Sequence, residues 1–245
     1  MHGLAMYVAS FLVAMGLGLG ASSAAAADLV LIVDASTEMP WAQLQRNQVL
    51  AGLHWDLGQA LAKQLGRDLR FLVLPRKRIA RALEAGDGDL VCGLLPKWFA
   101  GPFDWSLPVL PDGELILSLA SATAPKAISE LRGKPLGTVS GFVYPELEQT
   151  LGEGFVREDA PNAAANLRKL NLGRMQYAVS NQLYVDYQRH QGALKVALNP
   201  DFMLASYVMP CALSRRSQIK LDALNQAITQ LERSGALHQM SSAYR

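Results

Sequence analysis

Apolar residues along the chain fall into short runs that alternate with helical patterns, which predicts an α/β protein. Leu29–Ala35 is an apolar, β-branched run typical of a buried strand. His54–Leu65 has apolar residues at helical spacing and ends at Gly66, a common helix C-terminal signal. Next come a predicted strand over Leu69–Leu74, a helix over Arg78–Ala85 and a strand over Asp89–Leu95. This β-α-β-α-β order implies a parallel sheet with right-handed crossovers.

After a further predicted strand over Gly113–Ser121, the alternation begins again. Strands are then predicted over Pro135–Val139, Met175–Ser180, Ala193–Leu198 and Tyr207–Leu213, and helical segments over Ile128–Leu131, Val143–Leu151, Ala163–Leu170, Leu183–Arg189 and Ser217–Ser234. Two successive α/β sets predict two small lobes. In open α/β sheets ligands bind outside the carboxyl ends of the strands, so we expect a ligand cleft between the lobes.

Composition narrows the class of protein. Of the 245 residues, 50% are hydrophobic and 18% are charged, which excludes intrinsic disorder. The 23 Lys and Arg against 21 Asp and Glu leave a net charge of +2. Because a nucleic-acid binder needs a basic surplus to neutralise phosphates, we expect no nucleic-acid partner.

Residues 1–27 contain no Asp, Glu, Lys or Arg. An apolar run over Leu4–Leu19 is followed by small residues and by three alanines before Asp28, a pattern that predicts a secretory signal peptide over 1–27. A retained membrane anchor is the alternative, although a spanning helix needs about 20 apolar residues and four glycines dilute this segment. We expect the mature chain, 28–245, to be periplasmic.

Export would place Cys92 and Cys211 in an oxidising compartment, where they can pair, although two buried free thiols are the alternative. The mature histidines His54, His190 and His238 are far apart and have no metal-binding spacing. No motif supplies a nucleophile with a base. We therefore expect no metal, no cofactor and no catalytic residue.

The run Arg76-Lys77-Arg78 directly follows the predicted strand Leu69–Leu74. A helix begins there as well, and its free N–H groups add partial positive charge. This place at a strand's carboxyl end predicts an anion-binding edge, with Arg78 as the preferred residue. A solvated charged surface is the alternative.

Aromatic residues cluster on loops that follow predicted strands, at Trp41, at Lys97-Trp98-Phe99, and at Phe142 and Tyr144. Core positions are more common for aromatic side chains, but cores favour the interiors of elements over loops. We expect these groups to line one cleft, with Trp41 as the first candidate for a ligand contact.

Several short motifs follow one another in order along Asp28–Arg245. They are Pro40-Trp41, GLHWDL at 52–57, LEAGDGD at 83–89, DWSLP at 104–108, LRGKPLG at 131–137, Leu170–Arg174 and the C-terminal Leu224–Tyr244. In this order and spacing the chain resembles the bacterial extracellular solute-binding proteins of family 3, the periplasmic amino-acid-binding type.

The resemblance implies a two-lobed periplasmic-binding-protein-like fold, in which each lobe is a mostly parallel sheet flanked by helices. The first lobe would comprise 28–117 and 208–245, and the second 118–207, with hinge strands near Leu117–Leu119 and Tyr207–Met209. It implies a monomeric, non-enzymatic protein that closes on a small-molecule ligand and delivers it to the membrane permease of an ABC transporter. The family's topology also makes the strands of Cys92 and Cys211 neighbours, which predicts a disulfide.

Departures from the family pattern bear on the ligand. Amino-acid-binding members carry an arginine that clamps the ligand carboxylate, and here Phe99 occupies that place with Lys97 nearby. The acidic residue for the ligand's amino group is replaced by Asn181. The expected ligand-binding residues are Trp41, Arg78, Lys97, Trp98, Phe99, Ser140, Gly141, Phe142, Tyr144, Asn181 and Gln182. This set favours a small polar or aromatic solute over a free α-amino acid.

Two other functions stay open. A secreted enzyme on the same scaffold, such as a dehydratase, would need a cleft carboxylate as general acid or base, and Asp104 and Glu114 are the candidates. A ligand-sensing module for a signalling receptor is the other. A permease and an ATPase encoded beside the gene would indicate uptake, and a sensor kinase would indicate signalling.

Overall fold

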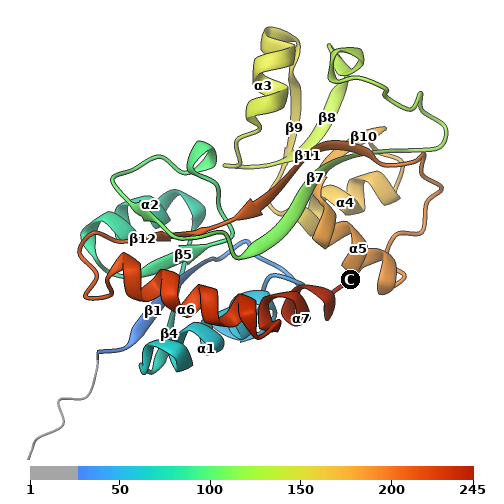
Figure 1. Ribbon diagram of the computed structural model, residues 1–245. Helices are drawn as coiled ribbons and strands as arrows, with labels where there is room; N and C mark the ends of the chain where they lie inside the picture. The colour runs from blue at the N-terminus through green and yellow to red at the C-terminus, as the bar shows by residue number, and fades with distance from the viewer. Residues whose placement is uncertain (1–26) are drawn as a thin grey trace, which may run out of the picture.

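Two five-stranded sheets, each carrying helices, make up the computed structural model, which describes residues 27–245 (Figure 1). The predicted signal peptide lies, except for its last residue, outside the described residues. Within residues 27–245 no helix is both long and apolar enough to cross a membrane. The predicted α/β class is confirmed.

The first sheet has the strand order β4-β1-β5-β12-β6. Its strands are β1 (Leu29–Asp34), β4 (Leu69–Leu74), β5 (Leu90–Cys92), β6 (Asp104–Trp105) and β12 (Cys211–Leu213). β1 runs parallel to β4 and β5, as the alternation predicts, whereas β12 is antiparallel to β5 and β6. This sheet therefore combines the first half of the chain with a strand that returns near the C-terminus.

Helices cover both faces of the first sheet: α1 (Leu53–Leu65), α2 (Arg76–Ala85), α6 (Leu221–Arg233) and α7 (Ala236–Ser242). Alternating β1 side chains point to opposite faces. Leu31 packs in the core that α1 and α6 share, and Ile32 packs in the core beneath α2. α1 ends at Gly66, which has the left-handed conformation (φ 63°) that glycine adopts without steric cost.

The second sheet has the order β11-β7-β10-β8-β9. Its strands are β7 (Leu110–Ser118), β8 (Pro135–Val139), β9 (Val156–Ala160), β10 (Tyr177–Asn181) and β11 (Phe202–Met209). Its helices are α3 (Pro145–Leu151), α4 (Ala163–Asn171) and α5 (Gln182–His190), with single turns at η2 (Ile128–Leu131) and η3 (Gly152–Gly154). A hairpin of β2 (Gln43–Gln45) and β3 (Gln48–Ala51) and the turn η1 (Pro96–Trp98) complete the elements.

The chain crosses between the sheets next to two long strands of the second sheet. β7 and β11 run antiparallel side by side, with Leu110 opposite Met209, across the middle of the molecule (Figure 1). The chain leaves the first sheet after Trp105 and re-enters it at Cys211. β7 thus belongs to the second sheet from its first residue, and the crossings lie at 106–109 and at residue 210.

One predicted strand is wrong and another is interrupted. Ala193–Leu198 forms no ladder strand, and only Leu198 makes an isolated bridge, to Leu119. Its apolar spacing reflects packing, because Leu194 and Leu198 lie against the core of the second sheet. The predicted strand Tyr207–Leu213 is split at Pro210 between β11 and β12. Proline has no N–H to continue a ladder, so the chain changes sheets there.

Candidate ligand-binding site

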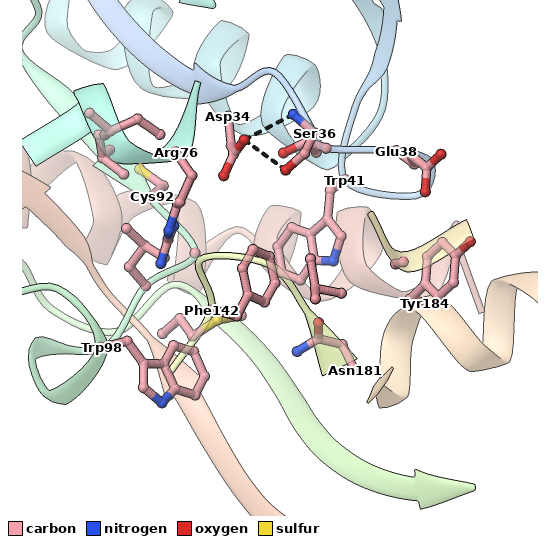
Figure 2. A pocket seen from close by; sticks show the side chains of 18 of the residues that line it. Asp34, Ser36, Glu38, Trp41, Arg76, Cys92, Trp98, Phe142, Asn181 and Tyr184 are labelled. Carbon is pink, nitrogen blue, oxygen red and sulfur yellow. Dashed lines mark hydrogen bonds between the residues drawn. The ribbon is translucent and has the colours of Figure 1, made fainter. Parts of the chain in front are cut away.

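A pocket lies between the two sheets, at the carboxyl end of β1, and both sheets contribute side chains to it (Figure 2). The first-sheet side includes Asp34, Glu38, Trp41 and Arg76, and the second-sheet side includes Glu114, Phe142, Asn181 and Tyr184. The cavity volume is about 140 Å³. An engineered apolar cavity of about 150 Å³ holds benzene, so this space suits a small solute.

Asp34 is the last residue of β1 and carries one free carboxylate oxygen. Its Oδ1 accepts hydrogen bonds from the backbone N–H of Ser36 (2.9 Å) and from the Ser36 hydroxyl (2.8 Å). Its Oδ2 is buried and has no hydrogen-bond partner among residues 27–245. Because an unpaired buried carboxylate oxygen is costly, this atom is ready to accept a hydrogen bond from a ligand.

Arg76, the first residue of α2, brings positive charge into the pocket. Its guanidinium carbon lies 5.3 Å from the ring centroid of Phe142 and 6.0 Å from that of Phe99. Burial lowers the pKa of Arg76, an effect that the nearby Asp34 carboxylate opposes. An arginine nonetheless stays charged near neutral pH, so this half-buried side chain is a cation in the cavity.

Glu38 joins the two sides of the pocket. Its Oε2 accepts a hydrogen bond from the backbone N–H of Ala164, in the first turn of α4, at 2.8 Å. Burial raises the pKa of Glu38, while this hydrogen bond and the charge of Arg168 lower it. A second contact between the sides is the ion pair of Lys97, in η1, with Glu146, in α3.

Glu114, on β7, is buried at the second-sheet side of the pocket, and its Oε2 has no partner among the described residues. Burial, helped by the charge of Glu146 and opposed by Lys97, raises the pKa of Glu114 to about 8. Near neutral pH this side chain is therefore a neutral carboxylic acid, which donates a hydrogen bond as well as accepting one.

His54, in α1, lies beside Trp41 with ring centroids 5.6 Å apart. Burial lowers the pKa of His54 to about 4, so its ring is neutral near pH 7. Its Nδ1 is buried without a hydrogen-bond partner in the part of the chain that the structure describes. His54 thus adds one more uncharged polar group to the wall.

The structure brings part of the predicted set together. Trp41, Trp98, Phe142, Tyr144 and Asn181 line the pocket. Two of them also have protein partners, since the Tyr144 hydroxyl accepts from the backbone N–H of Val139 (2.9 Å) and the Asn181 amide donates to the Tyr207 hydroxyl (3.1 Å).

The other predicted residues lie elsewhere. Phe99 is 7% exposed and stacks on Phe103 in the core beneath α2, with ring centroids 5.0 Å apart. Arg78, Ser140 and Gly141 are exposed and do not line the pocket, and Gln182, the first residue of α5, does not line it either. Lys97 is exposed and held in its ion pair.

Arg76 takes the place in the pocket that was expected for Arg78, because α2 begins two residues earlier than predicted. Successive helical residues are about 100° apart, so a side chain two positions along faces a different way. Asp34 was not among the predicted site residues. Its position, a carboxylate at the carboxyl end of an apolar strand, would have indicated a place in the pocket. His54 and Tyr184 sit inside helical patterns and gave no such signal.

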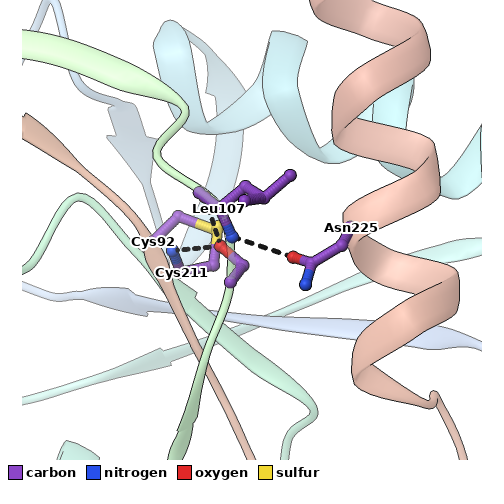
Figure 3. The surroundings of a disulfide bond; sticks show 5 residues. Cys92, Leu107, Cys211 and Asn225 are labelled. Carbon is purple, nitrogen blue, oxygen red and sulfur yellow. Dashed lines mark hydrogen bonds between the residues drawn. A yellow bond between two sulfur atoms is a disulfide. The ribbon is translucent and has the colours of Figure 1, made fainter.

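Cys92 and Cys211 form a disulfide at directly opposed positions of β5 and β12 (Figure 3). Cys92 also lines the pocket. Beside the bond, the backbone N–H of Leu107 donates to the Asn225 side chain of α6 (2.8 Å). The wall of the pocket is thus covalently tied to the strand that returns from the second sheet.

Comparison with known proteins shows which family this chain matches. Residues 29–245 match the model of a family described as bacterial extracellular solute-binding proteins, family 3. A search of curated proteins finds no match.

Solved structures share the fold. An ancestral arginine-binding protein bound to arginine is 20% identical, with a TM-score of 0.72, over 89% of this chain and 97% of that one. An ancestral amino acid-binding protein, a precursor of cyclohexadienyl dehydratase, is 19% identical, with a TM-score of 0.70, over 89% and 95%. The GluR0 ligand-binding core from Nostoc punctiforme, in complex with L-glutamate, is 18% identical, with a TM-score of 0.70, over 88% and 98%. At these identities the likeness concerns the fold alone.

Proposed function

Because this chain belongs to the bacterial extracellular solute-binding proteins, family 3, we propose that it captures a small solute in the pocket and delivers it to the permease of an ABC-type uptake system. The membership confirms the resemblance that the motifs indicated. The observation that carries the proposal is the pocket itself, which both sheets line and in which Asp34 and Glu114 each keep a buried oxygen without a partner among the described residues.

The proposed cellular setting is the periplasm, with the protein acting as a monomer. The uncharged, alanine-rich segment 1–27 supports export through a signal peptide. The Cys92–Cys211 bond supports an oxidising compartment, because disulfides are rare in the bacterial cytosol.

In the proposed mechanism the two sheets, as two lobes, close on the solute by bending near the crossings at 106–109 and at 210. A ligand that touches both lobes favours the closed form by its differential affinity. The Glu38–Ala164 and Lys97–Glu146 contacts would form as part of the same closure. The lobe division proposed from the sequence, 28–117 with 208–245 around 118–207, is kept in outline, with its boundaries moved to the crossings at 106–109 and at residue 210.

The test is a solute panel screened by thermal shift, calorimetry and small-angle scattering. A true ligand should raise the melting temperature and reduce the radius of gyration. Trp41→Ala should lose binding, whereas Trp55→Ala, which removes an α1 tryptophan that stacks on Phe71 outside the pocket, should keep it. Tight binding with no change in radius, or binding that Trp41→Ala leaves intact, would refute capture by closure in this pocket.

Catalysis is a second candidate function, and Glu114 is the observation that favours it. A buried carboxylic acid with a pKa of about 8 is suited to protonate a leaving hydroxyl group. As the C–O bond breaks and water departs, the resulting Glu114 carboxylate would take the proton of the neighbouring C–H bond, whose electron pair forms a C=C bond. The other predicted carboxylate, Asp104, lies outside the pocket and pairs with Arg215 at 3.0 Å. Mass spectrometry of a hydroxylated solute that binds the protein tests this function. Loss of one water from the solute with the wild-type protein, and no loss with Glu114→Gln, would indicate a dehydratase.

A further inference from the structure

Glu114 lies where the approach of the two sheets determines whether water reaches it. It stands on β7, shortly after the crossing at 106–109, and pairs in register with Asn181 of β10 and Ala205 of β11. The residue lines the pocket and is 5% exposed. Because the pocket lies between the sheets, separating them would expose the Glu114 carboxyl group to water.

The turn η1, on the first-sheet side, covers this part of the second sheet. The ring of Trp98 packs edge-on against Tyr207 of β11, with ring centroids 4.8 Å apart. The preceding residue, Lys97, forms its ion pair with Glu146 of α3. η1 therefore brings one positive charge to the surroundings of Glu114 when the sheets are together, and would withdraw it when they separate.

Glu114, Glu146 and Lys97 form a group that we call the carboxyl cluster. In each of its two carboxyl groups the oxygen Oε2 is buried and has no hydrogen-bond partner among residues 27–245. The ammonium group of Lys97 is already paired with Glu146. Two ionised carboxylates against one ammonium group would leave a surplus negative charge in the enclosed cluster.

Neighbouring elements do not supply the missing positive charge. Asp112, on the same strand, carries a negative charge that raises the pKa of Glu114 further. Burial raises the pKa of Tyr144 and of Tyr207, so both phenols are neutral near pH 7. The other charged and titratable groups nearby are Asp186 and Arg245, which act on Asp112, and Asp34, Glu38, Arg76 and His54 on the first-sheet wall of the pocket.

A proton on Glu114 removes the surplus charge. An ionised carboxylate enclosed without a partner is strongly disfavoured, and a like charge close by raises its pKa. The pKa of about 8 for Glu114 agrees with this environment, since burial and the charge of Glu146 are its first causes. When the sheets separate, water solvates the carboxylate and its pKa falls toward the ordinary value of 4.5.

We propose that the two sheets close with uptake of one proton from solvent, which binds the Glu114 carboxylate in the closed molecule and returns to water when the sheets separate. This inference rests on the proposed capture by closure and adds the proton as a second ligand of the closed form. Since Glu114 has its higher pKa in the closed form, the closing equilibrium weakens as pH rises from about 4.5 to about 8. By linkage, a solute that favours closing is held more tightly at acid pH and released more readily at alkaline pH.

Small-angle scattering of the solute-free protein at about pH 7 and about pH 9 tests the proposal. The closing equilibrium constant should fall about tenfold between them, because Glu114, with a pKa of about 8, goes from mostly protonated to mostly ionised. The radius of gyration should therefore be larger at the higher pH. Asp112, whose pKa is about 6, is mostly ionised at both values and adds little to the change.

Variants and infrared spectra assign the change to one proton. Glu114→Gln cannot ionise and should keep the smaller radius at both pH values. The matched control is Glu148→Gln, which removes an exposed carboxylate on the same helix as Glu146 and should keep the wild-type pH dependence. In the wild type a carboxylic-acid C=O band should be present at the lower pH and lost at the higher one. Glu114→Gln should lack this pH-dependent band.

An equal radius at both pH values in the wild type would overturn the proposal, and so would a pH-dependent radius that Glu114→Gln retains. A wild-type spectrum without the band at the lower pH would overturn it as well. A solute that contracts the molecule and binds with equal affinity at both pH values overturns this inference alone. The proposed function fails separately, if no solute of the panel contracts the molecule at either pH.

Discussion

Glu38 and Ala164 are 126 residues apart in the chain, yet the Glu38 carboxylate accepts the Ala164 backbone N–H at 2.8 Å. One residue follows β1 of the first sheet, and the other lies in the first turn of a helix on the second sheet. A helix N-terminus favours a negative charge, so this contact stabilises the arrangement in which the sheets enclose the pocket.

We expect Glu38→Ala to weaken solute binding by roughly fivefold, because a hydrogen bond in exchange with water contributes about 1 kcal/mol. Scattering should show a larger average radius for the ligand-free variant. The control is Glu84→Ala, which removes an exposed carboxylate on α2 far from the contact. Unchanged affinity and radius in Glu38→Ala would show that the contact does not stabilise the closed form.

Glu114 should make stability depend on pH. Its pKa is about 8 in the folded protein and near its ordinary value when unfolded, so the folded state holds the extra proton between these limits. Stability is then full below about pH 4.5 and falls as pH rises toward 8, by about 1 kcal/mol per pH unit. Urea unfolding should show this fall in the wild type.

The matched variant for this prediction is Glu114→Gln, which keeps the shape and cannot ionise. Relative to wild type it should gain stability as pH rises from about 5 to about 8. A difference between the two proteins that stays constant over this range would mean that Glu114 is ionised in the folded state.

Asn199 should contribute strongly to stability despite lying in an irregular segment. Its side-chain amide donates to the Ser118 hydroxyl and to the carbonyls of Leu119 and Ala122, at 2.8–3.1 Å. Asn199→Ala should lower the free energy of unfolding by about 2 kcal/mol, since three partly buried acceptors lose their donor. Gln191→Ala, at an exposed position earlier in the same connection, should change it little, and an equal effect of the two substitutions would argue against the network.

The disulfide should contribute about 4–5 kcal/mol in the chain-entropy model, because Cys92 and Cys211 are 119 residues apart. The double variant Cys92→Ser with Cys211→Ser is expected to lose stability of this order in denaturant unfolding. Thiol titration of unfolded, unreduced wild type should detect no thiol. Two thiols in freshly exported protein would show that the bond does not form in the cell.

The apolar pattern predicted most of the fold because buried strands and amphipathic helices impose it. Leu69–Leu74 and Pro135–Val139 are strands with the predicted bounds. β9 escaped prediction because it pairs only with β8 at a sheet edge and its sequence, VREDA, is mostly polar. Pro210 lacks the backbone N–H that a strand ladder needs, which indicates a break. The apolar residues on both sides of it instead predicted one continuous strand.

The site was predictable to the extent that it depends on loops. Trp41, Trp98 and Phe142 follow strands and line the pocket, whereas Phe99, from the same predicted group, turns into the core beneath α2. Which of Arg76 and Arg78 points into the pocket depends on the residue at which α2 begins. An error of two residues in that position assigns the pocket to the wrong arginine. The Glu38–Ala164 contact depends on how the sheets meet, which no local pattern encodes.

The position of the Cys92–Cys211 bond has a consequence for proteolysis. All five strands of the second sheet lie within the loop that the bond closes. A protease that cuts once between residues 93 and 210 therefore leaves both fragments attached, and they should migrate as one species without reductant and as two with it. A nick in the second sheet would also leave β1, β4 and α2 uncut, so the nicked molecule would retain both Asp34 and Arg76 on an intact chain segment.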